Sequence, residues 1–151
     1  MSNATEIRTG KHVAFLLHVH LVVVTKYRRA VFTKNMLKAL NDIFTKICED
    51  FESVLVEFDG EKDHVHLLVN YPPNISISKL VNSLKGVSSR ILRSSFKNEI
   101  SKMLWKNVLW SPSYFVGSCG GATLDVVKKY IHSQNTPSFQ ESRDECLASS
   151  T

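Results

Sequence analysis

The segment Asp63-His64-Val65-His66-Leu67-Leu68-Val69 governs the interpretation of this sequence, because it alternates two histidines with apolar residues. Successive side chains of a β-strand point to opposite faces of a sheet, so this alternation is typical of a strand. His64 and His66 would then lie side by side, where two imidazoles can share a metal ion. The opposite face would carry the core side chains Val65, Leu67 and Val69. Taken alone, the pattern is more often two structural histidines.

Composition favours a single domain with an acidic partner. The chain has 151 residues, a formal net charge of +5 and a pI of about 9.2. A chain of this length can bury a real core, and nucleic acid is the commonest partner of a basic domain. An ordinary basic surface remains the alternative.

Three widely separated cysteines, Cys48, Cys119 and Cys146, argue against a disulfide framework or a zinc site and for a reducing compartment. No apolar run reaches membrane-spanning length. We expect residues 1–12 to be a tag remnant, marked by Ser2-Asn3-Ala4, and an N-terminal tail. The domain would span residues 13–137, with a C-terminal tail at 138–151.

Hydrophobic periodicity predicts alternating strands and helices. Residues 12–24 form an apolar, β-branched first strand, and Thr33 can cap a helix that ends near Asp50. A second strand and the histidine strand would form a hairpin, with Gly60 at a positive φ in its turn. The remaining expected elements are strands at 53–58, 62–70 and 113–118 and helices at 76–96 and 123–134. The two long helices would bury the stripes Met36, Leu37, Leu40, Ile43, Phe44, Ile47 and Ile77, Leu80, Val81, Leu84, Val87, Ile91.

This order, βαββαβ followed by a helix, predicts an α+β fold of the ferredoxin-like or RRM-like kind. Its four-stranded antiparallel sheet carries two helices on one face, and the first and third strands form the central pair. That pairing would bring His18 and His20 next to His64 and His66. The sheet's other face would be an open platform for a ligand.

The last expected helix carries Tyr130 and Gln134, which are four residues apart and share one helical face. A glutamine oxygen can complete a site begun by two imidazoles, and such a ligand set suits Mg²⁺ or Mn²⁺. A tyrosine beside that ion can attack a phosphodiester and form a covalent phosphotyrosine. The plainer interpretation is a tyrosine at the core edge and a surface glutamine.

Five short segments occur in the order found in one family of enzymes. They are His20-Leu21-Val22-Val23-Val24-Thr25-Lys26-Tyr27-Arg28-Arg29, Asp63-His64-Val65-His66-Leu67-Leu68, Leu84-Lys85-Gly86-Val87-Ser88-Ser89-Arg90, Trp110-Ser111-Pro112-Ser113-Tyr114-Phe115 and the helix with Tyr130 and Gln134. Over residues 13–135 the sequence resembles the small HUH (histidine-hydrophobe-histidine) tyrosine transposases, TnpA type, of insertion sequences that move as single-stranded DNA.

The resemblance implies that His64, His66 and Gln134 bind a divalent metal and that Tyr130 is the nucleophile. It implies a 5′-phosphotyrosine intermediate, a free 3′-OH and recognition of imperfect DNA hairpins near the element's ends. It also implies a prokaryotic, cytoplasmic protein that acts on the nucleoid as a homodimer. Each active site would then take its histidines from one subunit and its tyrosine helix from the other. Gly120-Gly121 would be the hinge for that exchange.

The second histidine pair, His18 and His20, competes for the metal. An aspartate precedes His64, as in the family's metal strand, whereas Leu17 precedes His18, so we assign the metal to His64 and His66. His20 either hydrogen-bonds near the site or simply packs. The candidate DNA-contacting residues, whose alternative is a solvated basic surface, are Lys26, Tyr27, Arg28, Arg29, Lys85, Arg90 and Arg93.

Two other functions remain open from the sequence. A domesticated relative that cuts repeated palindromic chromosomal sequences would use identical chemistry. A non-catalytic RRM-like nucleic-acid-binding module would share the sheet, but histidines stand where its stacking aromatic residues are expected.

Overall fold

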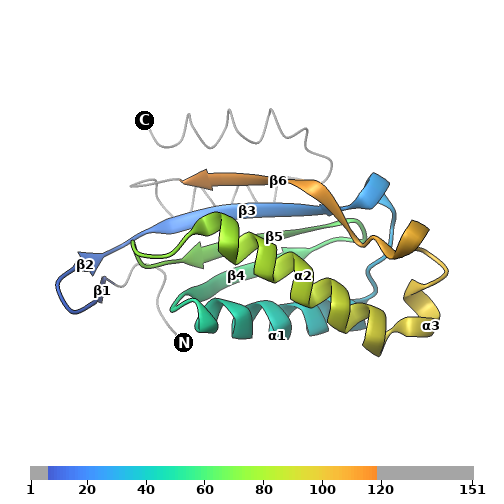
Figure 1. The fold of residues 1–151 in the computed structure, drawn as a ribbon, viewed down its shortest axis with the longest axis horizontal. Helices are drawn as coiled ribbons and strands as arrows, with labels where there is room; N and C mark the ends of the chain where they lie inside the picture. The colour runs from blue at the N-terminus through green and yellow to red at the C-terminus, as the bar shows by residue number, and fades with distance from the viewer. Residues whose placement is uncertain (1–6, 119–151) are drawn as a thin grey trace.

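Four antiparallel strands and two long helices account for most of residues 7–118, the part of the chain that the computed structural model describes (Figure 1). The main elements are β3 (His18–Thr25), α1 (Lys34–Asp50), β4 (Val54–Gly60), β5 (His64–Asn70), α2 (Ile77–Ser95) and β6 (Trp110–Ser118). The sheet order is β4-β5-β3-β6, with β3 and β5 as the central pair. The predicted ferredoxin-like arrangement is therefore confirmed. The expected helix at 123–134 and the glycine pair lie outside the described residues.

Along the two central strands, side chains alternate between a face that packs into the core and a face that carries the histidines. β3 and β5 are antiparallel, and their register places Val22 opposite His66 and Val24 opposite His64. Alternate residues of both strands pack against the helices in the hydrophobic core, as Val65, Leu67 and Val69 were predicted to do. The remaining residues, including both histidines, point away from α1 and α2.

Helix α1 follows its sequence pattern closely. The Thr33 side chain accepts a hydrogen bond from the Met36 backbone N at 3.2 Å, which satisfies one of the free N–H groups at the helix start. The buried side chains recur at helical spacing and are Met36, Leu40, Phe44, Ile47 and Cys48.

Helix α2 departs from the predicted stripe in its second half. Leu80, Val81 and Leu84 are buried as expected, but Ile91 is 36% exposed and Leu92 is 0% exposed. The buried position between Leu84 and Leu92 is Ser88, whose hydroxyl accepts a hydrogen bond from Trp110 Nε1 at 2.9 Å. A buried serine interrupts the hydrophobic pattern, so the pattern indicates Ile91 where the structure buries Leu92.

The apolar run at 12–24, expected as one strand, is broken in two. Ala14–Phe15 (β2) pairs with Arg8–Thr9 (β1) in a separate hairpin, and the main sheet is entered at His18. His18 pairs with Asn70, and Tyr71-Pro72-Pro73 then ends β5 because proline cannot donate to the ladder. The strand pairing with β5 therefore begins at His18, and the carbonyl oxygen of Leu17 accepts a hydrogen bond of 3.1 Å from the Tyr71 backbone N.

Arg8 ties this hairpin to the domain. Its guanidinium donates to Asn70 Oδ1 at 2.8 Å and to the Glu52 carbonyl oxygen at 2.6 Å, and it lies over the Phe15 ring. Packed structure thus begins before residue 13, within the segment expected to be a tail.

The expected positive φ at Gly60 is wrong. Gly60 is the last residue of β4, and the turn to β5 follows it at residues 61–63. A Cβ at this position would lie 2.6 Å from Leu37 Cδ2 and 3.2 Å from Val65 Cγ1. Close approach of α1 to the sheet, and not turn geometry, explains the glycine.

Short elements connect α2 to β6. They are α3 (Lys97–Ile100) and the 3₁₀ turn η2 (Trp105–Asn107), while a similar turn, η1 (Lys26–Arg28), follows β3. β6 begins at Trp110, three residues before the expected start, and it accommodates Pro112 because it is an edge strand. No helix within residues 7–118 is long and apolar enough to cross a membrane.

The revised stripe of α2 gives a direct test. Leu92→Ala should lower the free energy of unfolding by about 2–5 kcal/mol, because it opens a cavity in the core. Ile91→Ala, the neighbouring control, should cost less than about 1 kcal/mol, since its side chain is partly solvated. Urea denaturation of both variants measures the difference. Equal losses would contradict the assignment of Leu92 to the core.

Candidate metal and nucleic-acid site

The histidine pair lies at the beginning of β5. His64 and His66 occupy the same face of the sheet, their ring centroids are 4.9 Å apart, and the rings are nearly perpendicular at 88°. The two side chains are almost fully buried, with 1% and 2% of their surface exposed. A metal–nitrogen bond of about 2.1 Å allows two rings at this separation to share one ion.

Asp63 orients the first of these rings. His64 Nδ1 lies 2.6 Å from Asp63 Oδ1, so the carboxylate accepts the Nδ1–H proton. This tautomer leaves the lone pair on His64 Nε2, which is buried and has no hydrogen-bond partner among the residues described. A carboxylate behind a histidine in this way is the usual support of a metal ligand, so His64 fits the predicted role.

Asp63 is itself held from two sides. Arg28 Nε donates to Asp63 Oδ2 at 3.2 Å, and Thr25 binds the Asp63 carbonyl oxygen through its backbone N at 2.9 Å and its hydroxyl at 3.2 Å. Burial alone raises the pKa of the Asp63 carboxyl, but the hydrogen bond from His64 and the charge of Arg28 outweigh it. The pKa therefore lies below its usual range, and the carboxylate is ionised.

His20 contacts the pair and His18 does not. The His20 ring stacks on His66 with centroids 5.9 Å apart and meets the edge of Phe115 at 5.6 Å. Burial, reinforced by the charge of His66, lowers the pKa of His20 to about 3, so its ring is neutral.

The expectation that His18 would also lie beside the pair is wrong, because the strands are antiparallel. His18 pairs with Asn70, four residues beyond His66. This separation is about 13 Å along the strand.

The histidine face is also less open than expected. Around the pair, His20, Val22 and Leu68 are each 1% exposed and Phe115 is 4% exposed. The two imidazoles therefore sit in a buried environment and not on a solvated platform.

Two imidazoles do not complete a metal site. Within residues 7–118, no group of three or more His, Cys, Asp or Glu side chains is placed to hold an ion. A third protein ligand must come from another residue type or from outside this range. Gln134, the predicted ligand, and Tyr130, the predicted nucleophile, both lie outside the described residues.

The turn η1 carries strained backbone next to this site. Tyr27 and Arg28 have φ values of 59° and 53°, and Lys106 and Asn107 in η2 have values of 54° and 59°. Each such residue costs about 1–3 kcal/mol and persists only where the surroundings fix it. A hydrogen bond of 2.9 Å from Lys26 N to the Leu109 carbonyl oxygen connects the two segments.

Candidate DNA-contacting side chains lie on this turn. Tyr27 is 64% exposed, and Lys26 Nζ lies 5.1 Å from the centre of its ring. An exposed aromatic ring with a lysine on its face suits stacking on a base. Arg29 is exposed and donates to the Met103 carbonyl oxygen at 3.1 Å.

The other three basic candidates belong to a different element. Lys85, Arg90 and Arg93 lie on α2, which covers the face of the sheet opposite the histidines (Figure 1). Lys85 Nζ donates to the Pro112 carbonyl oxygen at 3.2 Å and lies 5.8 Å from the centre of the Tyr114 ring. Burial lowers the pKa of Lys85 below its usual value.

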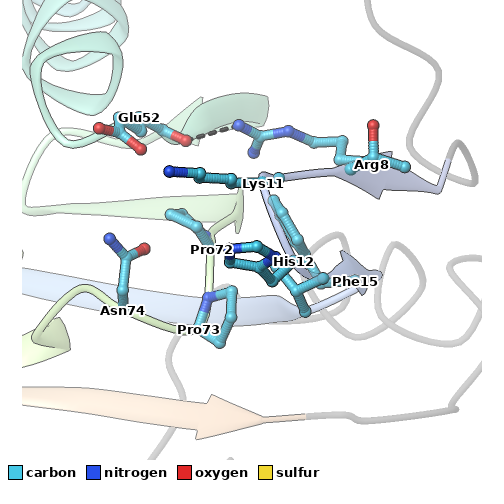
Figure 2. Close-up of a pocket in the computed structure, with 11 residues that line it drawn as sticks. Arg8, Lys11, His12, Phe15, Glu52, Pro72, Pro73 and Asn74 are labelled. Atoms are coloured by element: carbon cyan, nitrogen blue, oxygen red, sulfur yellow. Dashed lines mark hydrogen bonds between the residues drawn. The ribbon is translucent and has the colours of Figure 1, made fainter.

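A cavity of about 320 Å³ lies beneath the β1–β2 hairpin (Figure 2). Its lining residues Pro72 and Pro73 follow the last residue of β5, whereas His64 is the first residue of that strand. Lys11, His12, Pro72 and Pro73 line it, together with Arg8. The dashed contact in Figure 2 joins Arg8 to Glu52. Arg8 and Lys11 give this cavity its positive charge, and the Arg8 guanidinium also holds the hairpin.

Sequence reasoning missed the contacts that surround the histidine pair. It treated Arg28 as a DNA-contacting residue and gave Thr25 no role, although both hold Asp63. The only sequence signal for this arrangement was the aspartate directly before His64. Contacts between residues 35 positions apart require the tertiary fold.

Comparison with known proteins now identifies the family. Residues 13–134 match the family model described as "Transposase IS200 like". The ISDra2 transposase TnpA of Deinococcus radiodurans is 31% identical over 130 residues, which cover 86% of this chain and 92% of that protein. The transposase of insertion sequence element IS200 from Salmonella typhimurium is 32% identical over 124 residues, covering 82% and 80%.

Solved structures agree with these matches. The crystal structure of a putative transposase from Deinococcus radiodurans superposes with a TM-score of 0.68 at 31% identity, covering 86% of this chain and 99% of that one. A REP-associated tyrosine transposase bound to a REP hairpin has a TM-score of 0.55 at 16% identity, covering 77% and 64%. The second likeness concerns the fold alone. Together with the family model and the curated relatives, the first shows that this chain belongs to the IS200-like transposase family, whose members cleave and rejoin DNA.

Proposed function

We propose that this transposase cleaves and rejoins single-stranded DNA at insertion-sequence ends by metal-dependent transesterification. The observation that carries the proposal is the geometry of His64. Asp63 holds its Nδ1–H, its Nε2 is buried and available, and His66 lies beside it on the same face. This is an arrangement suited to binding a cation that activates a phosphodiester.

The nucleophile in this proposal is Tyr130. Its phenolic oxygen forms a bond to phosphorus, and the bond from phosphorus to the 3′ oxygen breaks. The proton lost by the phenol is balanced by the proton that the 3′ oxygen gains, which leaves a free 3′-OH. The 5′ end stays joined to Tyr130 as a phosphodiester, so rejoining by a 3′-OH needs no external energy source.

His64, His66 and Gln134 would hold the ion, and a set of two nitrogens and one oxygen suits Mg²⁺ or Mn²⁺. When bound, the ion would withdraw electron density from the scissile phosphate and offset the charge that develops there. The protein contributes the fixed orientation of the His64 ring and a buried environment that strengthens electrostatic interactions.

The proposed substrate is a single strand that folds into an imperfect hairpin near the element's end. The net charge of +5, the half-buried Lys26 and the exposed Tyr27 and Arg29 support contact with a nucleic acid backbone and with unpaired bases. A protein of the same fold, the REP-associated tyrosine transposase, was solved bound to a REP hairpin, and we extend that class of substrate to this chain. The natural substrate would be chromosomal DNA in a prokaryotic nucleoid.

We further propose a homodimer in which the histidines of one subunit meet the tyrosine helix of the other. Gly120-Gly121 would be the hinge, because glycine adopts the varied backbone conformations that such an exchange needs. This part of the proposal is supported by the family membership and by the position of the glycines between β6 and Tyr130 in the sequence.

The two alternative functions are less well supported. The insertion-sequence transposases are 31% and 32% identical to this chain, whereas the REP-associated transposase is 16% identical. The higher identities favour a mobile element over a domesticated relative that cuts repeated palindromic sequences. An RRM-like binding module has no use for a buried histidine pair of which one ring, that of His64, is oriented by a carboxylate.

Tyr130→Phe should abolish covalent attachment to an end-labelled single strand in Mg²⁺, because phenylalanine lacks the attacking oxygen. Hairpin binding should be retained. Denaturing gel electrophoresis measures the adduct, and Tyr114→Phe is the matched control that keeps it. Persistence of the adduct in Tyr130→Phe would place the nucleophile elsewhere.

His66→Ala should lower metal-dependent cleavage by at least about 100-fold, because it removes a proposed ligand. His18→Ala should leave cleavage within about threefold, since His18 lies about 13 Å along the strand from the pair. Single-turnover cleavage at increasing Mn²⁺ compares the two variants. Similar losses in both would contradict the assignment of the metal to His64 and His66.

A hairpin-bearing single strand should bind more tightly than a plain duplex of equal length. With about four phosphate contacts, affinity should fall about 50-fold between 50 and 200 mM salt, because each contact releases counterions from the strand. Electrophoretic mobility shifts across a salt series measure both effects. Equal affinity for duplex would exclude the hairpin as the recognised feature.

A further inference from the structure

We propose that Arg28 is a positioning residue for the metal ligand His64, acting through Asp63, and is not primarily a DNA-contacting residue. The inference rests on the proposed metal site. It adds a residue of η1, the turn after β3, that holds a histidine of β5 in position. Its basis is an unbroken line of polar contacts from η1 to the imidazole.

The first step is the pair of contacts on the Asp63 carboxylate. One oxygen accepts from His64 Nδ1 at 2.6 Å, and the other accepts from Arg28 Nε at 3.2 Å. With both oxygens engaged, the carboxylate cannot rotate without breaking one of these contacts. The guanidinium thus fixes the plane of the acceptor that selects the His64 tautomer.

The second step is the exposure of the groups involved. The Asp63 and Arg28 side chains are 27% and 38% exposed, whereas the His64 side chain is 1% exposed. Without Arg28, a partly solvated carboxylate could turn toward water. The buried imidazole would then lose the partner that keeps its proton on Nδ1, and the alternative tautomer places the proton on the ligating nitrogen.

The third step is the backbone of the turn. Tyr27 and Arg28 both adopt left-handed conformations, and Thr25 Oγ1 lies within hydrogen-bond distance of the carbonyl oxygens of Arg29, at 2.7 Å, and of Asp63, at 3.2 Å. These contacts hold the turn against the start of β5. The strained conformation places Arg28 where its side chain reaches back to Asp63.

Arg29 provides a matched comparison within the same turn. It carries the same charge, and its Nη1 donates to the Met103 carbonyl oxygen, away from Asp63. A role limited to DNA attraction would make the two arginines similar. A positioning role would set Arg28 apart in measurements that contain no DNA.

Calorimetric titration of the full-length protein with Mn²⁺, in the absence of DNA, tests this difference. Arg28→Gln should weaken Mn²⁺ affinity about 10-fold, as expected for loss of a group that orients a metal ligand. Arg28→Lys, which keeps the charge beside Asp63, should lose less than about threefold, and Arg29→Gln less than about twofold. Thermal melting checks that each variant is folded.

A second measurement needs no metal. In ¹⁵N-histidine-labelled protein, the His64 ring nitrogens should show a single tautomer with the proton on Nδ1, and Arg28→Gln should show both tautomers. Should Arg28→Gln fail to fold, Asp63→Asn probes the same contact from the other side and should weaken Mn²⁺ affinity to a similar degree.

The outcomes separate this inference from the proposed function. Unchanged Mn²⁺ affinity and an unchanged tautomer in Arg28→Gln, or an equal loss of affinity in Arg29→Gln, would overturn the inference. Failure of the unsubstituted protein to bind Mn²⁺ would overturn the metal-dependent function, and the tautomer measurement would still decide the role of Arg28.

Discussion

Hydrogen bonds on both sides of β5, to β3 and to β4, fix the face of the sheet on which each of its side chains lies. Its odd-numbered apolar residues complete the core beneath α1 and α2, and His64 and His66 are directed to the other face by the same repeat. The candidate site thus depends on core packing that contains none of its residues. One face of β5 packs into the hydrophobic core, and the other face carries the candidate site.

The surroundings of the histidine pair join three parts of the chain. Asp63 precedes β5, Thr25 ends β3, and Arg28 belongs to the turn that follows it. Left-handed residues in two turns show that this end of the sheet holds unfavourable backbone conformations, which the rest of the fold stabilises. The cavity under the β1–β2 hairpin lies at the other end, so the sheet keeps two polar regions apart along its strands.

Elements of the fold were predicted correctly from the sequence wherever a local property of the chain determined them. The cap Thr33, the start of α2 near Ser76, the α1 stripe and the alternation of β5 were predicted and confirmed, because each is a local property of the chain. The errors arose where tertiary contacts decided. Ser88 is buried because Trp110 reaches it, and Gly60 is required because Leu37 is close. The link from Arg28 to His64 was invisible for the same reason.

The two-residue repeat of β5 also limits how this protein can vary in length. An added or deleted residue within the strand would turn every following side chain to the opposite face, exchanging imidazole for valine at the proposed metal site and placing a histidine in the core. Residues 61 and 62 lie between the two strands and precede Asp63, so a change of length there leaves the alternation of β5 intact. Natural insertions in this lineage should therefore collect in loops, while the strand that carries the histidines keeps a constant number of residues.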